Sequence, residues 1–340
     1  MRMLQAWMRG WAVFSVLALW VAAANGQPDY GIDFVTIGHV GNRGTLPSEN
    51  PLTPEISSGA VNYEYRIARG VLSETEYLEF AQAYSPYVTT LSEAADLAGA
   101  WLGATQRPNG QYDFFITTGH ENVAAGLSWE MAARYCNWLC NNKATNREAF
   151  ENGAYDTSTF DRSNSSRYQL QHNPGARFWI PSFDELVKAV YYDPNRYGPG
   201  QEGYWQQPNG SDNELIQGRP GTGGETIGGI HVGPNLFIGE GPLGQYPDTH
   251  SPLGLIDVSG TLPQYSSSLI GGAPVRVVGS ASGSPSYRYS DRIDSSITAG
   301  LAFDPLNTLR IASAVVPAPT WVALGSCFVS IALKRRHRQC

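Results

Sequence analysis

The sequence is poor in cysteine and in charge. Only four cysteines occur in 340 residues, and charged residues make up 16% of the chain. Cys327 and Cys340 lie near the C-terminal end, which leaves Cys136 and Cys140 for the rest. One pair four residues apart excludes a disulfide-rich scaffold, and the stretch 133–142 contains no histidine or acid that would complete a zinc site. We therefore expect two small buried residues on one helix face.

Recognisable catalytic motifs are also missing. The chain has no G-x-S-x-G elbow, and the glycine-rich stretch 218–229 lacks the Lys-Ser/Thr end of a phosphate-binding loop. No two histidines stand two or four residues apart, although His231 and His250 fall in one loop region and could meet in space. The full set is His39, His120, His172, His231, His250 and His337. The adjacent Asp184 and Glu185 are explained by helix capping.

Basic residues are scarce in the body of the chain. The whole sequence carries 23 Lys plus Arg against 30 Asp plus Glu. Six of the basic residues lie in the two terminal segments, which leaves 17 against 30 and a net charge of −13 between them. An acidic body without a basic stripe repels phosphate backbones, so nucleic acid is excluded as a partner.

Residues 1–26 have the pattern of a secretory signal peptide. Arg2 and Arg9 precede an apolar run from Trp11 to Ala23, and small residues follow. The run is short for a membrane span, which needs about 20 apolar residues. We expect cleavage by signal peptidase near Gln27 and export of the chain; a retained anchor is the alternative.

The C-terminal segment 315–340 shows a second membrane-related pattern. An apolar run at 321–333 follows Pro317 and Pro319 and predicts a short transmembrane segment. A basic cluster comes next, which includes Lys334, Arg335 and Arg336. The layout resembles the bacterial PEP-CTERM sorting tail, which an exosortase cuts, although Ala318 stands where the glutamate of that tail would be. An ordinary C-terminal anchor is the alternative, and both place the protein in the cell envelope, anchored or released after processing.

The middle of the chain predicts one α+β domain over residues 30–314, with modest regular content and long loops. Helices are expected at 73–84, 128–142 and 181–194; the first and third begin with capping boxes, Ser73 with Glu76 and Ser182 with Glu185. Strands are expected at 61–67, 33–38, 274–281 and 309–315. Residues 193–251 should be a long excursion of loops.

Several segments, in this order, resemble the sulfatase-modifying-factor domain, the fold of the formylglycine-generating enzyme and a relative of the C-type lectin fold. They are "GAVNYEYRIARGVLSETEYLEFAQAY", "LSWEMAARYCNWL", "WIPSFDELVKAVYYDP", "LGLIDVSGTLPQY", "VRVVGS" and "LRIA". The match covers nearly the whole body, and the resemblance implies a C-type-lectin-like α+β fold with little regular secondary structure.

The same resemblance implies a metal chemistry that this chain lacks in part. Family members bind calcium through an asparagine and a glutamate, where this chain has Thr261 and Gln264 after Asp257. Neutral oxygens attract calcium weakly, so we expect a degenerate site, with calcium possible and Asp257 serving as a turn residue. The family enzyme also holds copper with two late cysteines, but residues 271–316 contain none, so copper is not expected.

Two functions follow from these expectations. The first is a non-catalytic surface module that binds a glycan, a peptide or a matrix component through its loops. The second is a divergent oxidase or other enzyme that uses unrecognised residues, for instance the polar cluster of Tyr287, Arg288, Tyr289 and Asp291. An ordinary polar loop is the favoured interpretation of that cluster. Arg276, Tyr287 and Gln264 are the residues expected to border any pocket.

Overall fold

The computed structural model describes residues 28–160, 168–230, 241–269, 275–280, 291–295, 297–299 and 305–315. Residues 31–315 form one compact unit; of the other unit, 1–30 with 316–340, only residues 28–30 are described. The predicted signal peptide, the sorting tail and its apolar run therefore lie outside the described residues. Within the described ranges, no helix is both long enough and apolar enough to cross a membrane.

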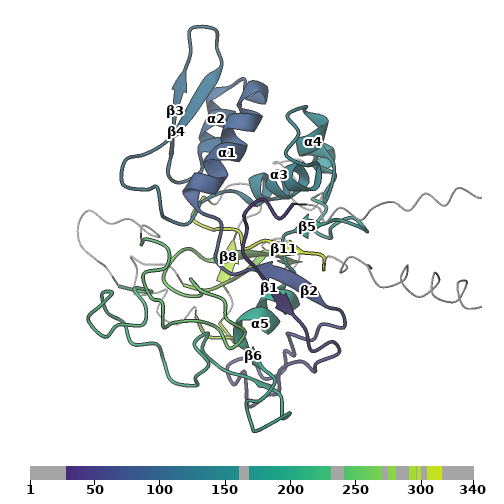
Figure 1. The fold of residues 1–340 in the computed structure, drawn as a ribbon, viewed down its shortest axis with the longest axis vertical. Coiled ribbons are helices and arrows are strands. Elements are labelled where there is room, and N and C mark those ends of the chain that lie inside the picture. Colours follow the sequence, from purple (N-terminus) through teal and green to yellow (C-terminus); the bar gives the residue numbers. More distant parts are fainter. Residues whose placement is uncertain are drawn as a thin grey trace, which may run out of the picture. The chain divides into compact units, whose positions relative to one another are not determined.

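The fold mixes helices and short strands, as the sequence predicts (Figure 1). The helices are α1 (Glu74–Tyr84), α2 (Leu91–Ala98), α3 (Trp129–Cys140), α4 (Glu148–Glu151) and α5 (Phe183–Tyr191), with 3₁₀ turns η1 (Ser85–Tyr87) and η2 (Thr157–Thr159). The strands are β1 (Phe34–Ile37), β2 (Tyr65–Ala68), β3 (Leu102–Gln106), β4 (Tyr112–Ile116), β5 (Phe178–Trp179), β6 (Tyr192–Asp193), β7 (Gly203–Tyr204), β8 (Gln264–Leu269), β9 (Val275–Val278), β10 (Ile297–Ala299) and β11 (Ala312–Ser313).

A four-stranded antiparallel sheet joins distant parts of the chain in the order β1-β2-β11-β5. Ala312 of β11 pairs with Ile67 on one side and Trp179 on the other. In the view of Figure 1, α1 to α4 lie above this sheet and α5 lies below it. Strands β8 to β10 form a second antiparallel sheet, and β3-β4 and β6-β7 form two-stranded ribbons. The first and the last strand of residues 31–315, β1 and β11, therefore belong to the same sheet.

Capping boxes fix the starts of three helices. Ser73 with Glu76 begins α1, and Ser182 with Glu185 begins α5, as predicted. The third box, Thr90 with Glu93, begins α2, a helix that the sequence analysis did not predict. Helix α3 begins at the predicted cap, Ser128, whose side chain accepts from the Met131 amide. The three predicted helices are thus confirmed; α1 ends at Tyr84 as predicted, whereas α3 and α5 end two and three residues before the predicted C-termini.

Aromatic side chains fill the core between α1, α3 and α4. Phe80 is fully buried, and its ring lies within 6 Å of the rings of five neighbours. These neighbours are Tyr77, Tyr84, Tyr135, Trp138 and Phe150. The packing explains why α3 is buried all round rather than along one stripe.

All four predicted strands are shorter in the structure: 33–38 is reduced to β1 and 274–281 to β9. The segment 61–67 is extended as a strand only from Tyr65, and Tyr63 is 45% exposed, so the predicted alternation fails at that position. The segment 309–315 keeps only two strand residues, because Leu309 and Ile311 bond to the backbone of the segment 68–72 outside the regular ladder. The predicted loop excursion is confirmed where it is described, since β7 is the only strand in 194–230 and 241–251.

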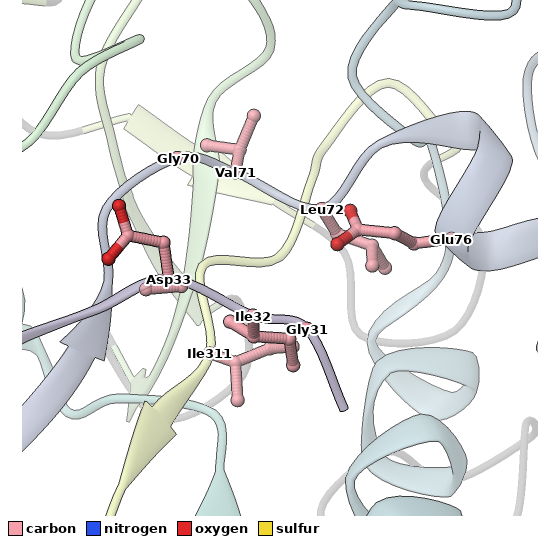
Figure 2. A pocket seen from close by; sticks show the side chains of 9 residues that line it. Gly31, Ile32, Asp33, Gly70, Val71, Leu72, Glu76 and Ile311 are labelled. Carbon is pink, nitrogen blue, oxygen red and sulfur yellow. The ribbon is translucent and has the colours of Figure 1, made fainter. Parts of the chain in front are cut away.

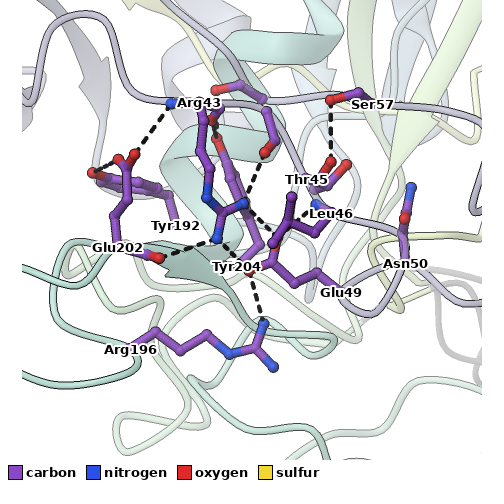
Figure 3. Close-up of polar contacts among 12 residues, drawn as sticks. Arg43, Thr45, Leu46, Glu49, Asn50, Ser57, Tyr192, Arg196, Glu202 and Tyr204 are labelled. Atoms are coloured by element: carbon purple, nitrogen blue, oxygen red, sulfur yellow. Dashed lines mark hydrogen bonds and ion pairs between the residues drawn. The ribbon is translucent and has the colours of Figure 1, made fainter.

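A buried carboxylate ties the loop 43–59 to the segment 196–204 (Figure 3). Glu49 is fully buried, and its carboxylate accepts hydrogen bonds from both terminal nitrogens of Arg43, each at 2.7 Å. It also accepts from the amides of Leu46 and Tyr204, and Arg196 lies 3.7 Å away. A burial this deep is stable because nearly every lone pair of the carboxylate is used.

Candidate functional site

The predicted calcium loop is ordered, but its side chains serve other purposes. Asp257 has a left-handed backbone (φ 52°), and its Oδ1 accepts from the Gly244 amide at 2.7 Å. Burial raises the pKa of this carboxyl. Thr261 is buried, and Gln264 begins β8. The expectation that Asp257 is a turn residue agrees with this geometry.

The oxygen atoms around this loop hold an arginine. Arg310 is fully buried, and its Nε donates to the Gln264 side-chain oxygen at 2.7 Å. Its Nη1 donates to the carbonyls of Ala68 and Arg69, and its Nη2 donates to those of Ile256 and Asp257. The chain's own guanidinium is therefore the cation that this oxygen cluster surrounds.

A very small cavity lies beside the loop. It has a volume of about 10 Å³, which is about the space for one water molecule. Its lining includes the predicted Asp257 and Thr261, but not Gln264, which points to Arg310. The structure thus brings only two of the three predicted positions to one cavity. Among the described residues, no three His, Cys, Asp or Glu side chains gather in a way that could hold a metal ion.

A buried network of hydroxyls lies behind the loop, and sequence reasoning did not find it. Asp291 is 2% exposed, and its Oδ2 accepts from the hydroxyls of Ser259 and Ser280, each at 2.7 Å. Thr226 extends the network to Ser259 at 2.5 Å. Burial raises the pKa of Asp291 to about 6 against these hydrogen bonds.

Of the polar cluster expected around Asp291, the structure describes Asp291 alone. Tyr287, Arg288 and Tyr289 lie outside the described residues, as does the side chain of Arg276. Asp291 itself is turned inward to the hydroxyl network rather than toward a loop surface. The partners of Asp291 in this network, such as Ser259 and Thr226, are far from it in the sequence. No local sequence pattern around Asp291 therefore predicts the network.

Of the two cysteines expected to be buried on α3, Cys136 is confirmed as buried, whereas Cys140 is only partly buried. Cys136 is fully buried, and both cysteines are free. The Cys140 thiol donates to the Phe178 carbonyl at 3.5 Å. Burial raises the pKa of both thiols. Both groups are therefore held in the neutral form, which is neither a nucleophile nor a metal ligand.

The described histidines are scattered. His120 stacks on Trp101 and His172 stacks on Trp179, with ring centroids 5.0 and 4.6 Å apart. His250 contacts a backbone carbonyl through Nδ1. His231 and His337 lie outside the described residues, so the predicted approach of His231 to His250 is not described.

One pocket of about 230 Å³ lies between β1, β2 and the start of α1 (Figure 2). Two carboxylates, those of Asp33 and Glu76, stand on opposite sides of it. Asp33 pairs with Arg69 at 2.6 Å, and Glu76 is committed to the capping box of α1 through Ser73. Both carboxylates are engaged within the chain, and the described lining of this pocket includes no arginine, lysine or histidine side chain.

A second pocket, here called the helical pocket, has a volume of about 280 Å³. It lies where the end of α1 and the start of α2 approach α3 and the residue before α4. It is lined by Tyr84, Tyr87, Val88, Glu93, Glu130, Met131, Arg134 and Arg147. Sequence reasoning missed it, although the Glu130–Arg134 spacing is a visible ion-pair signal on a helix.

Comparisons with known proteins give similar folds only. No protein-family profile and no curated protein matches the sequence. Treponema denticola variable protein 1 is 12% identical with a TM-score of 0.48, over 84% of this chain and 95% of that one. CarF is 14% identical (TM-score 0.47, 85% and 99%), and PvdO from Pseudomonas aeruginosa is 12% identical (0.46, 83% and 94%). No site residue is transferred from them.

Proposed function

We propose that the body of this chain is a non-catalytic binding module of the formylglycine-generating-enzyme type, with a C-type-lectin-like α+β fold. One observation carries the proposal: Cys136 is fully buried on the core side of α3, Cys140 is partly buried and donates to the Phe178 carbonyl, and burial raises the pKa of both thiols. Copper(I) needs deprotonated, reachable thiolates. Residues 271–316, where the resemblance would place the ligands, contain no cysteine.

The loop around Asp257 supports the same proposal. A guanidinium held by Gln264 and four backbone carbonyls takes the acceptors that a bound cation would need. The role of this loop is then structural: it joins the C-terminal strand region to β2. Calcium has no further part in the proposed function.

The terminal patterns complete the proposal. A chain with a cleaved signal peptide at 1–26 and a short apolar run at 321–333 would present its acidic body outside the cytoplasm. Signal peptidase and an exosortase would process it, with Pro317, Pro319 and the basic cluster that includes Lys334, Arg335 and Arg336 as the sorting signal. The partner would then be a component of the cell surface or matrix.

A copper(I) titration tests the non-catalytic part. The full-length chain and its Cys136→Ala and Cys140→Ala variants are titrated with copper(I) in the presence of a competing chelator. We expect no stoichiometric uptake and no difference among the three proteins. One tight copper(I) ion per chain, lost in both variants, would show that the body is an enzyme of the oxidase type instead.

Cell fractionation tests the location. We expect the full-length chain in the envelope fraction, and a chain that ends at residue 314 in the soluble exported fraction. The exported chain should begin near Gln27 in N-terminal sequencing. Recovery of the intact N-terminus in the cytoplasm would refute export.

A further inference from the structure

The helical pocket is lined by two arginine–tyrosine pairs. The Arg134 guanidinium carbon lies 5.8 Å from the ring centroid of Tyr84, and that of Arg147 lies 6.0 Å from the ring of Tyr87. Arg134 is 7% exposed, whereas the Arg147 side chain is 68% exposed. One pair is therefore deep in the pocket and the other stands at its mouth.

Hydrogen-bond donors in the pocket are left without partners. Arg134 donates from Nη1 to Glu130 and from Nη2 to Glu151, but its buried Nε has no acceptor. The Tyr84 hydroxyl makes no hydrogen bond within the described chain. The Arg134 Nε is enclosed by the protein, whereas the Tyr84 hydroxyl is not, so Tyr84 is the donor that a ligand oxygen can reach.

Arg147 adds a cation at the mouth that is only loosely paired. Its Nε is 3.8 Å from the nearer Glu151 oxygen, which is beyond hydrogen-bond distance. The Arg147 guanidinium can therefore turn toward a ligand without breaking a hydrogen bond of the described chain. Together with Tyr84, it makes two donor groups that face one cavity.

The charges around the pocket favour an uncharged ligand. Arg134 and Arg147 are balanced by Glu130 and Glu151, and Glu93 adds one more carboxylate at the start of α2. An anion would face three carboxylates, and a cation would face two guanidinium groups. A neutral group that carries both lone pairs and O–H donors can satisfy Arg147 and Glu93 together.

The volume and the apolar lining of the helical pocket restrict the class of ligand further. About 280 Å³ is at the low end of the roughly 300–1,000 Å³ typical of ligand pockets. The buried Val88 and Met131 form an apolar part of the lining. A ligand with a single ring, polar groups on the ring edge and C–H groups on one face fits both the volume and the lining of the pocket.

We propose that the helical pocket binds one uncharged sugar ring, such as the end unit of a surface glycan. The inference rests on the proposed function as an exported binding module and gives it a site and a ligand class. Ring hydroxyls accept from Tyr84 and Arg147 and donate to Oε1 of Glu93, because Oε2 of Glu93 serves the capping box of α2. Val88 and Met131 contact the C–H face of the ring.

The test is saturation-transfer NMR of the full-length chain with D-glucose, D-galactose, D-mannose and N-acetyl-D-glucosamine, with D-glucuronate as a charged comparison. We expect at least one neutral sugar to bind, more tightly than glucuronate. Tyr84→Phe removes one hydroxyl, and Arg147→Gln removes an exposed cation, so each should weaken binding about tenfold, as the loss of one hydrogen bond predicts. Arg107→Gln is the matched control on the β3–β4 ribbon and should leave the affinity unchanged.

The outcomes separate the inference from the function on which it rests. If both pocket variants bind the sugar as tightly as the parent chain, the sugar binds elsewhere. That result contradicts the helical pocket as the sugar site but agrees with the proposed binding function. If glucuronate binds more tightly than the neutral sugars and the pocket variants weaken its binding, the proposal that the ligand is uncharged is wrong. Binding of none of the sugars overturns the inference, while the copper titration independently decides the non-catalytic function. An unchanged thermal transition confirms that each variant is folded.

Discussion

A buried arginine must satisfy five N–H donors, and Arg310 does so without a carboxylate. It uses one side-chain oxygen, that of Gln264, and four backbone carbonyls. Burial lowers the pKa of Arg310 to about 10, so the guanidinium stays protonated at neutral pH. Gln264 is thus explained as the acceptor that completes this set rather than as the remnant of a calcium ligand.

Replacing Gln264 by methionine tests this role. The change keeps the volume but leaves the buried Nε–H of Arg310 without an acceptor, so the free energy of unfolding should fall by about 1–3 kcal/mol. Urea denaturation at pH 7 measures the loss. The exposed Gln111→Met is the control and should stay within about 0.5 kcal/mol of the parent chain. Equal stability of Gln264→Met and the parent chain would contradict the assigned role.

Glu74 predicts a pH dependence at the alkaline side. Its carboxyl is fully buried at the start of α1, neither oxygen has a hydrogen-bond partner, and burial raises its pKa to about 8. The pKa of Glu74 is higher in the folded than in the unfolded chain. The contribution of this carboxyl to the free energy of unfolding is therefore fully present below about pH 4.5 and is lost as the pH rises through about 8. Glu74→Gln should remove this loss and raise the free energy of unfolding at pH 8 by a few kcal/mol, at most about 5.

The measurement is a series of denaturation curves from pH 5 to pH 8.5. The parent chain should lose stability across this range faster than Glu74→Gln. Glu79→Gln lies on the same helix in a surface pair with Lys143 and should follow the parent curve. Parallel curves for the parent chain and Glu74→Gln would show that the carboxyl is not held neutral in the fold.

At the scale of elements, the sequence predicts what is determined locally. Ser73 and Ser182 could be identified as helix starts because a capping box spans four residues. The same signal, Thr90 with Glu93, was present for α2 and went unused because the helix is only eight residues long. Strands β2 and β11 were placed but overextended, since their lengths depend on partners more than 100 residues away.

The capping box of α2 can be tested directly. Thr90→Ala removes the side-chain acceptor of the Glu93 amide and should cost about 0.5–2 kcal/mol. Hydrogen exchange should show the loss first in the amides of 91–98, because a helix this short depends on its cap. Ser92→Ala, an exposed change within the same helix, should leave exchange unaltered. Equal protection in both variants would argue that packing alone holds α2.

At the scale of the whole molecule, the sites depend on contacts that no local pattern encodes. The predicted loop could be located, but its use as a seat for Arg310 requires β2, the loop and residue 310 to meet. The helical pocket likewise exists only because α1, α2 and α3 converge. Arg134 falls off the predicted apolar stripe of its helix, so sequence alone places it on the surface, whereas the fold buries it.

Glu49 gives the acid-side prediction for the whole fold, because it links two loops about 150 residues apart. Burial tends to raise its pKa, but the hydrogen bonds from Arg43, Leu46 and Tyr204 outweigh burial and lower it. A lowered folded pKa contributes stability above about pH 4.5 that is lost as the pH falls through the folded value. Glu49→Gln should therefore lower the free energy of unfolding at pH 7 by about 2–4 kcal/mol and by less at pH 3.5. Trypsin cleavage after Arg43 and Arg196 should accelerate at pH 7, while Glu55→Gln, exposed on the same loop, should be cleaved at the parent rate. If Glu49→Gln resists trypsin as well as the parent chain does, the loops are held by apolar packing and not by this carboxylate.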